Sequence, residues 1–276
     1  MTAQEAPGPR LTTRQVAGDA LGLLRASFDG AWPWWFFLFV LETGDAARAV
    51  LMAPPAAAAG HPAAAIPPLT IGLTLVAGAI GAVLGGFALR TMIAGHKAPA
   101  RLDLGLLGYV ALTFAAEAIW TLLSLAASPL AERLIAYQGA APPPPDLLPQ
   151  ALGVLALFGV LAFVFTRLAL WPMARLTGAK AIGLVQSWRR MKGAVWPLIA
   201  ASLVVVMPVT LVGGLILTSV QGPTPGLTLA AAPLIGLMAA VSRALQLAVM
   251  AAIWRARIGV KVAVTVTRPP PTSAAD

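Results

Sequence analysis

The stretch Pro68–Leu89, PLTIGLTLVAGAIGAVLGGFAL, decides the class of fold. It lies within a run free of Asp, Glu, Lys and Arg that extends from Arg48 to Arg90. A helix of roughly 20 apolar residues spans the hydrocarbon core of a bilayer, where every backbone polar group must be satisfied internally. The stretch therefore predicts a transmembrane helix.

The composition of the whole chain agrees with this prediction. Of its 276 residues, 59% are hydrophobic and 11% are charged, and the mean hydropathy is +0.83. Soluble globular domains carry about a quarter charged residues and about half apolar ones. These values exclude a soluble chain and predict an all-α integral membrane protein.

We predict six transmembrane helices in this bundle. The first is ambiguous, because Glu42, Asp45 and Arg48 follow the apolar run WPWWFFLFVL at residues 32–41. This segment either crosses the membrane or ends early in a polar opening, and the distribution of charge favours crossing. The predicted spans are Trp32–Met52, Pro68–Leu89, Leu104–Ser128, Leu147–Leu170, Val195–Leu217 and Leu227–Trp254.

The cations predict the orientation of these spans. Six crossings place 16 of the 19 Lys and Arg on one side, and only Arg48 and Arg133 on the other, with Arg243 inside the membrane. Cytoplasmic loops concentrate Lys and Arg. We therefore expect both termini in the cytoplasm of a bacterial inner membrane, and no nucleic-acid partner despite the pI of about 11.3. The expected organisation is a cytoplasmic segment at 1–29, a membrane domain at 30–256 and a flexible cytoplasmic tail at 257–276.

Two amphipathic helices are expected at the cytoplasmic membrane surface. Thr12 and Gln15 form a capping-box pattern, and it precedes an apolar face formed by Val16, Ala20, Leu23, Leu24 and Phe28. The second helix, between the fourth and fifth spans, presents Ala181, Leu184, Val185 and Trp188 on one face. Basic side chains near it predict contact with anionic lipid headgroups, although topology alone would also require cations there. These side chains are Arg175, Lys180, Arg189, Arg190 and Lys192.

The stretch 167–196, RLALWPMARLTGAKAIGLVQSWRRMKGAVW, resembles a segment of YciC-like inner-membrane proteins and of the membrane domain attached to some glycerophosphodiester phosphodiesterases. The resemblance covers about 30 residues. It implies a six-helix membrane bundle without an agreed activity, and the phosphodiesterase catalytic domain has no counterpart in this chain. The matching positions are Arg167, Pro172, Ser187, Trp188, Arg189, Lys192 and Gly193.

Two opposite charges are expected at similar depth inside the membrane. Glu117 lies 13 residues after Leu104, and Arg243 lies 11 residues before Trp254. At 1.5 Å per residue, these positions are about 20 Å and 16 Å from the cytoplasmic side. The sequence therefore predicts an ion pair between Glu117 and Arg243. Such a pair serves either as a static lock between helices or as a gate or coupling element in a transporter.

Two further patterns concern the first and second spans. Glu42, Asp45 and Arg48 form an outer polar cluster that either lines a cavity or ends a helix at the outer surface, with Asp45 and Arg48 spaced for a local pair. The second span carries a stripe of small residues that permits close helix packing, with a neighbour in the same chain expected by default. The stripe comprises Gly78, Gly81, Ala82, Gly85 and Gly86.

The motifs of enzymes and cofactor sites are missing from the sequence. It has no cysteine, two histidines, and no H-E-x-x-H, G-x-S-x-G, P-loop or G-x-G-x-x-G pattern. We therefore expect no catalytic residues, no metal and no cofactor. The favoured interpretation is a non-enzymatic accessory or scaffolding protein that packs against lipids, a larger membrane complex or a second copy. The alternative is a small transporter or lipid-handling protein that uses Glu117 and Arg243.

Overall fold

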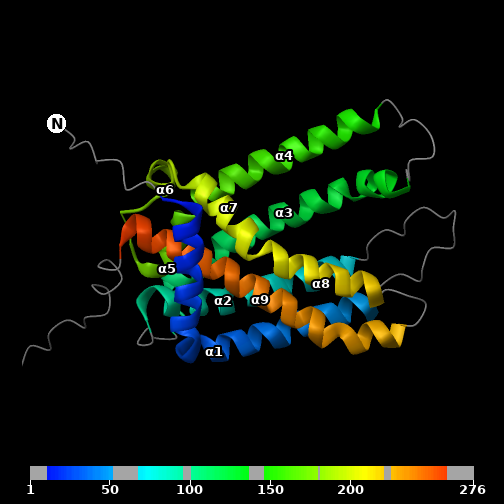
Figure 1. The fold of residues 1–276 in the computed structure, drawn as a ribbon, viewed down its shortest axis with the longest axis horizontal. Helices are drawn as coiled ribbons and strands as arrows, with labels where there is room; N and C mark the ends of the chain where they lie inside the picture. Colours follow the sequence, from blue (N-terminus) through cyan, green and yellow to red (C-terminus); the bar gives the residue numbers. More distant parts are fainter. Residues whose placement is uncertain are drawn as a thin grey trace, which may run out of the picture.

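A computed structural model of the chain describes residues 11–51, 68–95, 101–136, 146–179, 181–220 and 225–259. All regular secondary structure in these ranges is helical (Figure 1). The first ten residues, most of the predicted tail and Lys180 lie outside the described residues.

Four helical segments among the described residues are long and apolar enough to cross a membrane. They belong to α2 (Pro68–Ala94), α3 (Leu104–Ala136), α4 (Leu147–Leu168) with α5 (Leu170–Thr177), and α9 (Pro225–Ile258). A fifth arises if α7 (Val195–Val205) and α8 (Met207–Val220), which are bent by 41° at their junction, form one span. The chain is therefore a multi-pass membrane protein.

The first predicted span belongs to a longer helix, α1 (Thr13–Leu51). By the length and hydropathy that identify the other spans, α1 is not a candidate transmembrane helix. Its N-terminal part lies across one end of the bundle, and its later part runs beside α9 (Figure 1). Pro33 lies inside α1, where its missing N–H and its ring favour a bend.

The amphipathic face at the start of α1 packs against the protein itself. Val16, Ala20 and Leu23 are buried in the same hydrophobic cluster as Trp254 of α9, whereas Phe28 is exposed. The capping box forms as expected, because the Gln15 N–H donates to the Thr12 hydroxyl and the Thr12 N–H donates to the Gln15 side chain. Most of the predicted lipid-facing surface of this helix is therefore part of the core.

The second predicted surface helix is present as the short helix α6 (Leu184–Arg190), which follows the end of α5. Gly178 ends α5 in the left-handed conformation with φ 72°, a conformation that glycine adopts without strain. Leu184, Val185 and Trp188 of α6 are exposed, in agreement with the predicted apolar face. The buried side of this segment is formed by Ile182, Ser187 and Met191.

The hydrophobic core lies at the end of the bundle where α5, α6 and the start of α1 meet (Figure 1). Its fully buried large side chains include Met92, Leu106, Met173, Met191 and Trp254. By contrast, α4 carries exposed leucines along its length, such as Leu148, Leu152 and Leu155. The helices are thus packed tightly at one end and more loosely beyond it.

Candidate functional site

A cavity of about 610 Å³ lies within the membrane helices. The cavity is half open, and residues of α1, α2, α3, α4 and α9, segments far apart in the sequence, line it. Three carboxylates and one guanidinium line it, together with Gln246, several threonines and aromatic rings. The charged lining residues are Glu42, Asp45, Glu117 and Arg243.

Arg243 bridges two carboxylates in this cavity. Its Nη2 lies 2.7 Å from Glu117 Oε1, and its Nη1 lies 3.2 Å from Glu42 Oε1. The predicted contact between Glu117 and Arg243 is therefore present. Glu42, predicted to belong with Asp45 and Arg48, reaches instead to a residue 201 positions away. The sequence offered no signal for this third member, because it does not define how α1 is rotated towards α9.

Glycines of α2 leave room for these charged groups. A Cβ atom on Gly81 would collide with the Arg243 guanidinium, and one on Gly78 would lie 3.1 Å from Glu117 Oε2. The predicted small-residue stripe thus accommodates polar side chains as well as helices. Farther along α2, a Cβ on Gly86 would lie 2.6 Å from Leu106 Cδ1, which shows a close approach to α3.

Asp45 and Arg48 form the local pair that their spacing predicts. Arg48 Nη2 lies 2.6 Å from Asp45 Oδ1 and donates a hydrogen bond of 3.0 Å to the Thr74 hydroxyl on α2. Asp45 and Thr74 line the cavity. The carboxylate of the pair therefore belongs to the cavity wall, and Arg48 links α1 to α2.

The charged groups at the cavity are only partly buried. The exposed fraction of the side chain is 42% for Glu117, 25% for Arg243 and 22% for Glu42. The Coulomb attraction within an ion pair is stronger in a dry environment, but removing both charges from water costs free energy that can exceed this gain. Here one carboxylate stays accessible from the cavity.

The remaining lining is aromatic and weakly polar. Phe114 and Trp120 of α3 face the cavity with Phe165 of α4, and the Trp120 ring packs edge-on against Phe158 at 4.9 Å. The Thr166 hydroxyl donates to its own helix, at the Ala162 carbonyl. Such a lining of apolar rings with a few polar groups is typical of small-molecule sites.

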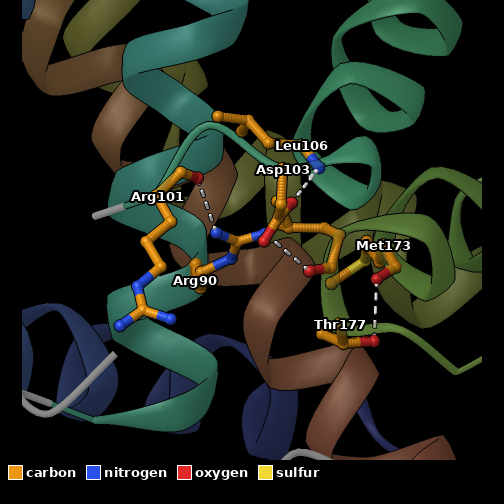
Figure 2. A network of polar contacts seen from close by, with 7 residues as sticks. Arg90, Arg101, Asp103, Leu106, Met173 and Thr177 are labelled. Carbon is orange, nitrogen blue, oxygen red and sulfur yellow. Dashed lines mark hydrogen bonds and ion pairs between the residues drawn. The ribbon is translucent and has the colours of Figure 1, made fainter. Parts of the chain in front are cut away.

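A second polar network lies at the densely packed end of the bundle (Figure 2). The buried Arg90 side chain donates to Asp103 Oδ1 at 2.8 Å, to the Arg101 carbonyl at 3.1 Å and to the Leu176 carbonyl at 3.2 Å. Asp103 Oδ1 also accepts the Leu106 N–H at 2.8 Å and so caps α3. The network ties α2, the start of α3 and α5 together.

The pKa of Asp103 reflects this network. Partial burial alone raises the pKa, but hydrogen bonds from Arg90 and the N–H groups of Leu106 and Gly105, with the Arg90 charge, outweigh burial. The pKa of Asp103 therefore lies below its ordinary value. Every contact described in this network joins two parts of the chain, so the network serves to hold α2, α3 and α5 together.

The predicted lipid-contact cations lie near the same end. Arg175, Arg189 and Lys192 are exposed, and Arg190 is half-buried. The Lys192 carbonyl accepts a hydrogen bond of 3.4 Å from Arg257 of α9, so its backbone is tied to the bundle. Three of the predicted lipid-contact cations are thus exposed at this end of the bundle.

Several positions of the stretch 167–196 meet around Arg167. Its guanidinium donates to the Trp188 carbonyl at 2.9 Å and lies over the rings of Phe163 and Trp188, with centroids 5.3 Å and 5.2 Å away. The buried Ser187 hydroxyl donates in return to the Arg167 carbonyl at 3.0 Å. These contacts fix α6 against the end of α4.

No protein-family model, curated protein or solved structure matches the chain. Among the described residues, no group of three or more His, Asp or Glu is arranged to hold a metal ion.

Proposed function

We propose that the protein is a small transporter or lipid-handling protein that binds a small molecule in the intramembrane cavity. The observation that carries this proposal is the accessible ion-pair cluster of Glu42, Glu117 and Arg243 in the cavity wall. Charged residues inside a membrane are costly and usually face a partner or a substrate pathway. A volume of about 610 Å³ suits a small-molecule ligand.

We further propose a topology of six spans for this function, with both termini in the cytoplasm of a bacterial inner membrane. The later part of α1 would be the first span, and α7 with α8 the fifth. The strong asymmetry of Lys and Arg supports this arrangement. The hydrogen bond from Arg48 to Thr74 of α2 and the ion pair of Glu42 with Arg243 of α9 support the placement of α1 beside the other spans.

An accessory or scaffolding role, the interpretation favoured from sequence, is the second candidate. The large apolar side chains exposed on α4 and α8, such as Leu155 and Leu215, favour it because a partner or a second copy would cover them. Lipid chains cover such surfaces equally well. The resemblance of residues 167–196 to YciC-like proteins is compatible with either role.

Bound molecules distinguish the two candidates. The full chain, isolated from native membranes in mild detergent, should retain a small molecule that mass spectrometry detects. Ala162→Trp places a large ring in the cavity wall and should abolish this binding. The control Ala156→Trp changes an exposed residue of the same helix outside the cavity lining, and it should leave binding intact.

The opposite result would favour the scaffold. In that case the wild type carries no small molecule, a protein partner co-purifies in fixed proportion, and Ala162→Trp leaves that complex unchanged. Binding that survives Ala162→Trp but not Ala156→Trp would place the site outside the cavity.

A further inference from the structure

We infer that the ligand of the cavity is an organic cation with an apolar or aromatic portion, such as an alkylated ammonium. This inference rests on the proposed function and names the class of its ligand. Three features of the cavity carry it. The lining has an excess of negative charge, Arg243 is already paired with carboxylates, and aromatic rings form part of the walls.

The charge balance of the cavity is negative. Glu42, Asp45 and Glu117 line it, and Arg243 is the cation among the lining residues. Arg48 lies beside the lining and is paired with Asp45. Arg243 remains to compensate both Glu42 and Glu117, which leaves one carboxylate charge in excess when all groups are ionised. An uncompensated negative charge attracts an opposite charge, so a cationic ligand would gain from pairing with it.

The arginine is poorly placed to recruit an anionic ligand. Its two terminal nitrogens already contact carboxylate oxygens, at 2.7 Å to Glu117 and 3.2 Å to Glu42. A phosphate or carboxylate entering here would have to displace one of these oxygens and would face the other carboxylates. Electrostatics in the cavity therefore discriminate against anions.

The walls suit the apolar part of a cation. Phe114, Trp120 and Phe165 present rings to the cavity, and the faces of such rings attract ammonium groups within about 6 Å. Glu117, with 42% of its side chain exposed, is the carboxylate most accessible to an incoming ligand. The geometry thus places an accessible negative charge among aromatic rings.

The inference is tested by direct binding of chosen probes to the purified full chain. Radiolabelled benzyltrimethylammonium should bind in equilibrium dialysis, after subtraction of its uptake by empty micelles. Its neutral isostere neopentylbenzene and the anion phenylacetate should compete poorly. Absence of benzyltrimethylammonium binding, or equal competition by either analogue, would overturn the inference.

Variants assign the binding to the proposed carboxylate. Glu117→Gln should weaken benzyltrimethylammonium binding roughly tenfold or more, because it removes the negative charge that attracts the ammonium group. Glu117→Asp keeps the charge and should retain most of the affinity, so it controls for folding. Asp146→Asn removes an exposed carboxylate that pairs with Arg133 outside the cavity lining, and it should bind as the wild type does.

The failure of this inference and that of the proposed function give different results. If phenylacetate or neopentylbenzene binds and Ala162→Trp abolishes that binding, the cavity is a ligand site for another chemical class. If Glu117→Gln binds benzyltrimethylammonium as tightly as the wild type, the excess carboxylate does not recognise the ligand. If none of the three probes binds and Ala162→Trp leaves the molecules bound in native membranes unchanged, the cavity itself is not the site.

Discussion

At the scale of single residues, Arg243 holds the cavity wall together because it faces two carboxylates from different helices. Glu42 comes from α1 and Glu117 from α3, so the three side chains connect three segments of the bundle. Removal of a carboxylate leaves a balanced pair, whereas removal of the arginine leaves two negative charges near one another. The two kinds of substitution should therefore differ in their effect on stability.

Arg243→Gln should lower the free energy of unfolding by about 1–3 kcal/mol, less than for a fully buried pair because the groups are partly exposed. Glu117→Gln should cost less, since Glu42 still balances Arg243. The double variant Glu117→Gln/Arg243→Gln should be more stable than Arg243→Gln alone, because it removes the repulsion between Glu42 and Glu117. Thermal unfolding in detergent, followed by tryptophan fluorescence, measures these differences. A double variant as unstable as the sum of the single ones would show that the charges do not interact.

At the scale of helices, the long contact between α1 and α9 depends on one glycine. A Cβ atom on Gly236 would lie 2.6 Å from the backbone nitrogen and Cα of Thr43, closer than packed atoms allow. The α1 and α9 backbones therefore approach each other directly, as small residues permit in membrane bundles.

Gly236→Ala should destabilise the protein by about 1–3 kcal/mol, because the backbones of α1 and α9 must separate. Gly214→Ala on α8 is the matched control, since a Cβ there meets nothing within 4 Å. It should be neutral, or stabilise by up to about 1 kcal/mol through helix propensity. Both are measured as shifts in the unfolding temperature, and equal shifts for the two variants would contradict the close approach.

The start of α3 depends on Asp103 in two separable ways. Asp103→Asn keeps an acceptor for the Leu106 N–H and removes the charge that faces Arg90. Asp103→Ala removes both, and we expect it to cost about 1 kcal/mol more through the lost helix cap. If thermal unfolding finds the two variants equally stable, the cap does not contribute.

The ion pair of Asp103 should also make stability depend on pH. The pKa of Asp103 is lowered in the folded protein, so its ionised form stabilises the fold above its ordinary value of 3.8. This contribution is lost as the pH falls through the lowered pKa. The difference in unfolding temperature between wild type and Asp103→Asn should stay constant near neutral pH and shrink below about pH 4. A difference that grows on acidification would contradict the assigned direction.

At the scale of the whole molecule, the dense core and the cavity occupy different parts of the bundle. The core contains α5, α6 and the start of α1, together with the ends of α2 and α9 (Figure 1). The polar network of Arg90 and Asp103 lies at the same end (Figure 2). Under the proposed topology this end is cytoplasmic. The cavity with its acidic lining would then lie within the membrane, beyond the core.

The topology can be tested with single cysteines, because the chain contains none of its own. Arg101→Cys and Lys192→Cys should react with a membrane-impermeant reagent from the cytoplasmic side, and Arg133→Cys from the opposite side. All three positions are exposed. Labelling of Arg101→Cys and Lys192→Cys from opposite faces would exclude six spans with both termini inside.

The sequence by itself determined the helical membrane class and the segments of α2, α3, α4 and α9. It also indicated that Glu117 and Arg243 lie at similar depth. These properties follow from hydropathy and from the rise per residue of a helix, which depend only on position along the sequence. The same information predicted the pair of Asp45 and Arg48, since residues three apart lie on one helix face.

Only the tertiary structure decided which helices stand side by side and how each is rotated. It brought Glu42 to Arg243, turned the apolar face of α1 onto the core, bent the helix between α7 and α8 and left a cavity among five helices. These outcomes depend on packing between segments that are far apart in the sequence, as the 201 positions between Glu42 and Arg243 illustrate. Depth along a helix can be calculated from sequence, whereas rotation about its axis is set by the neighbours against which it packs.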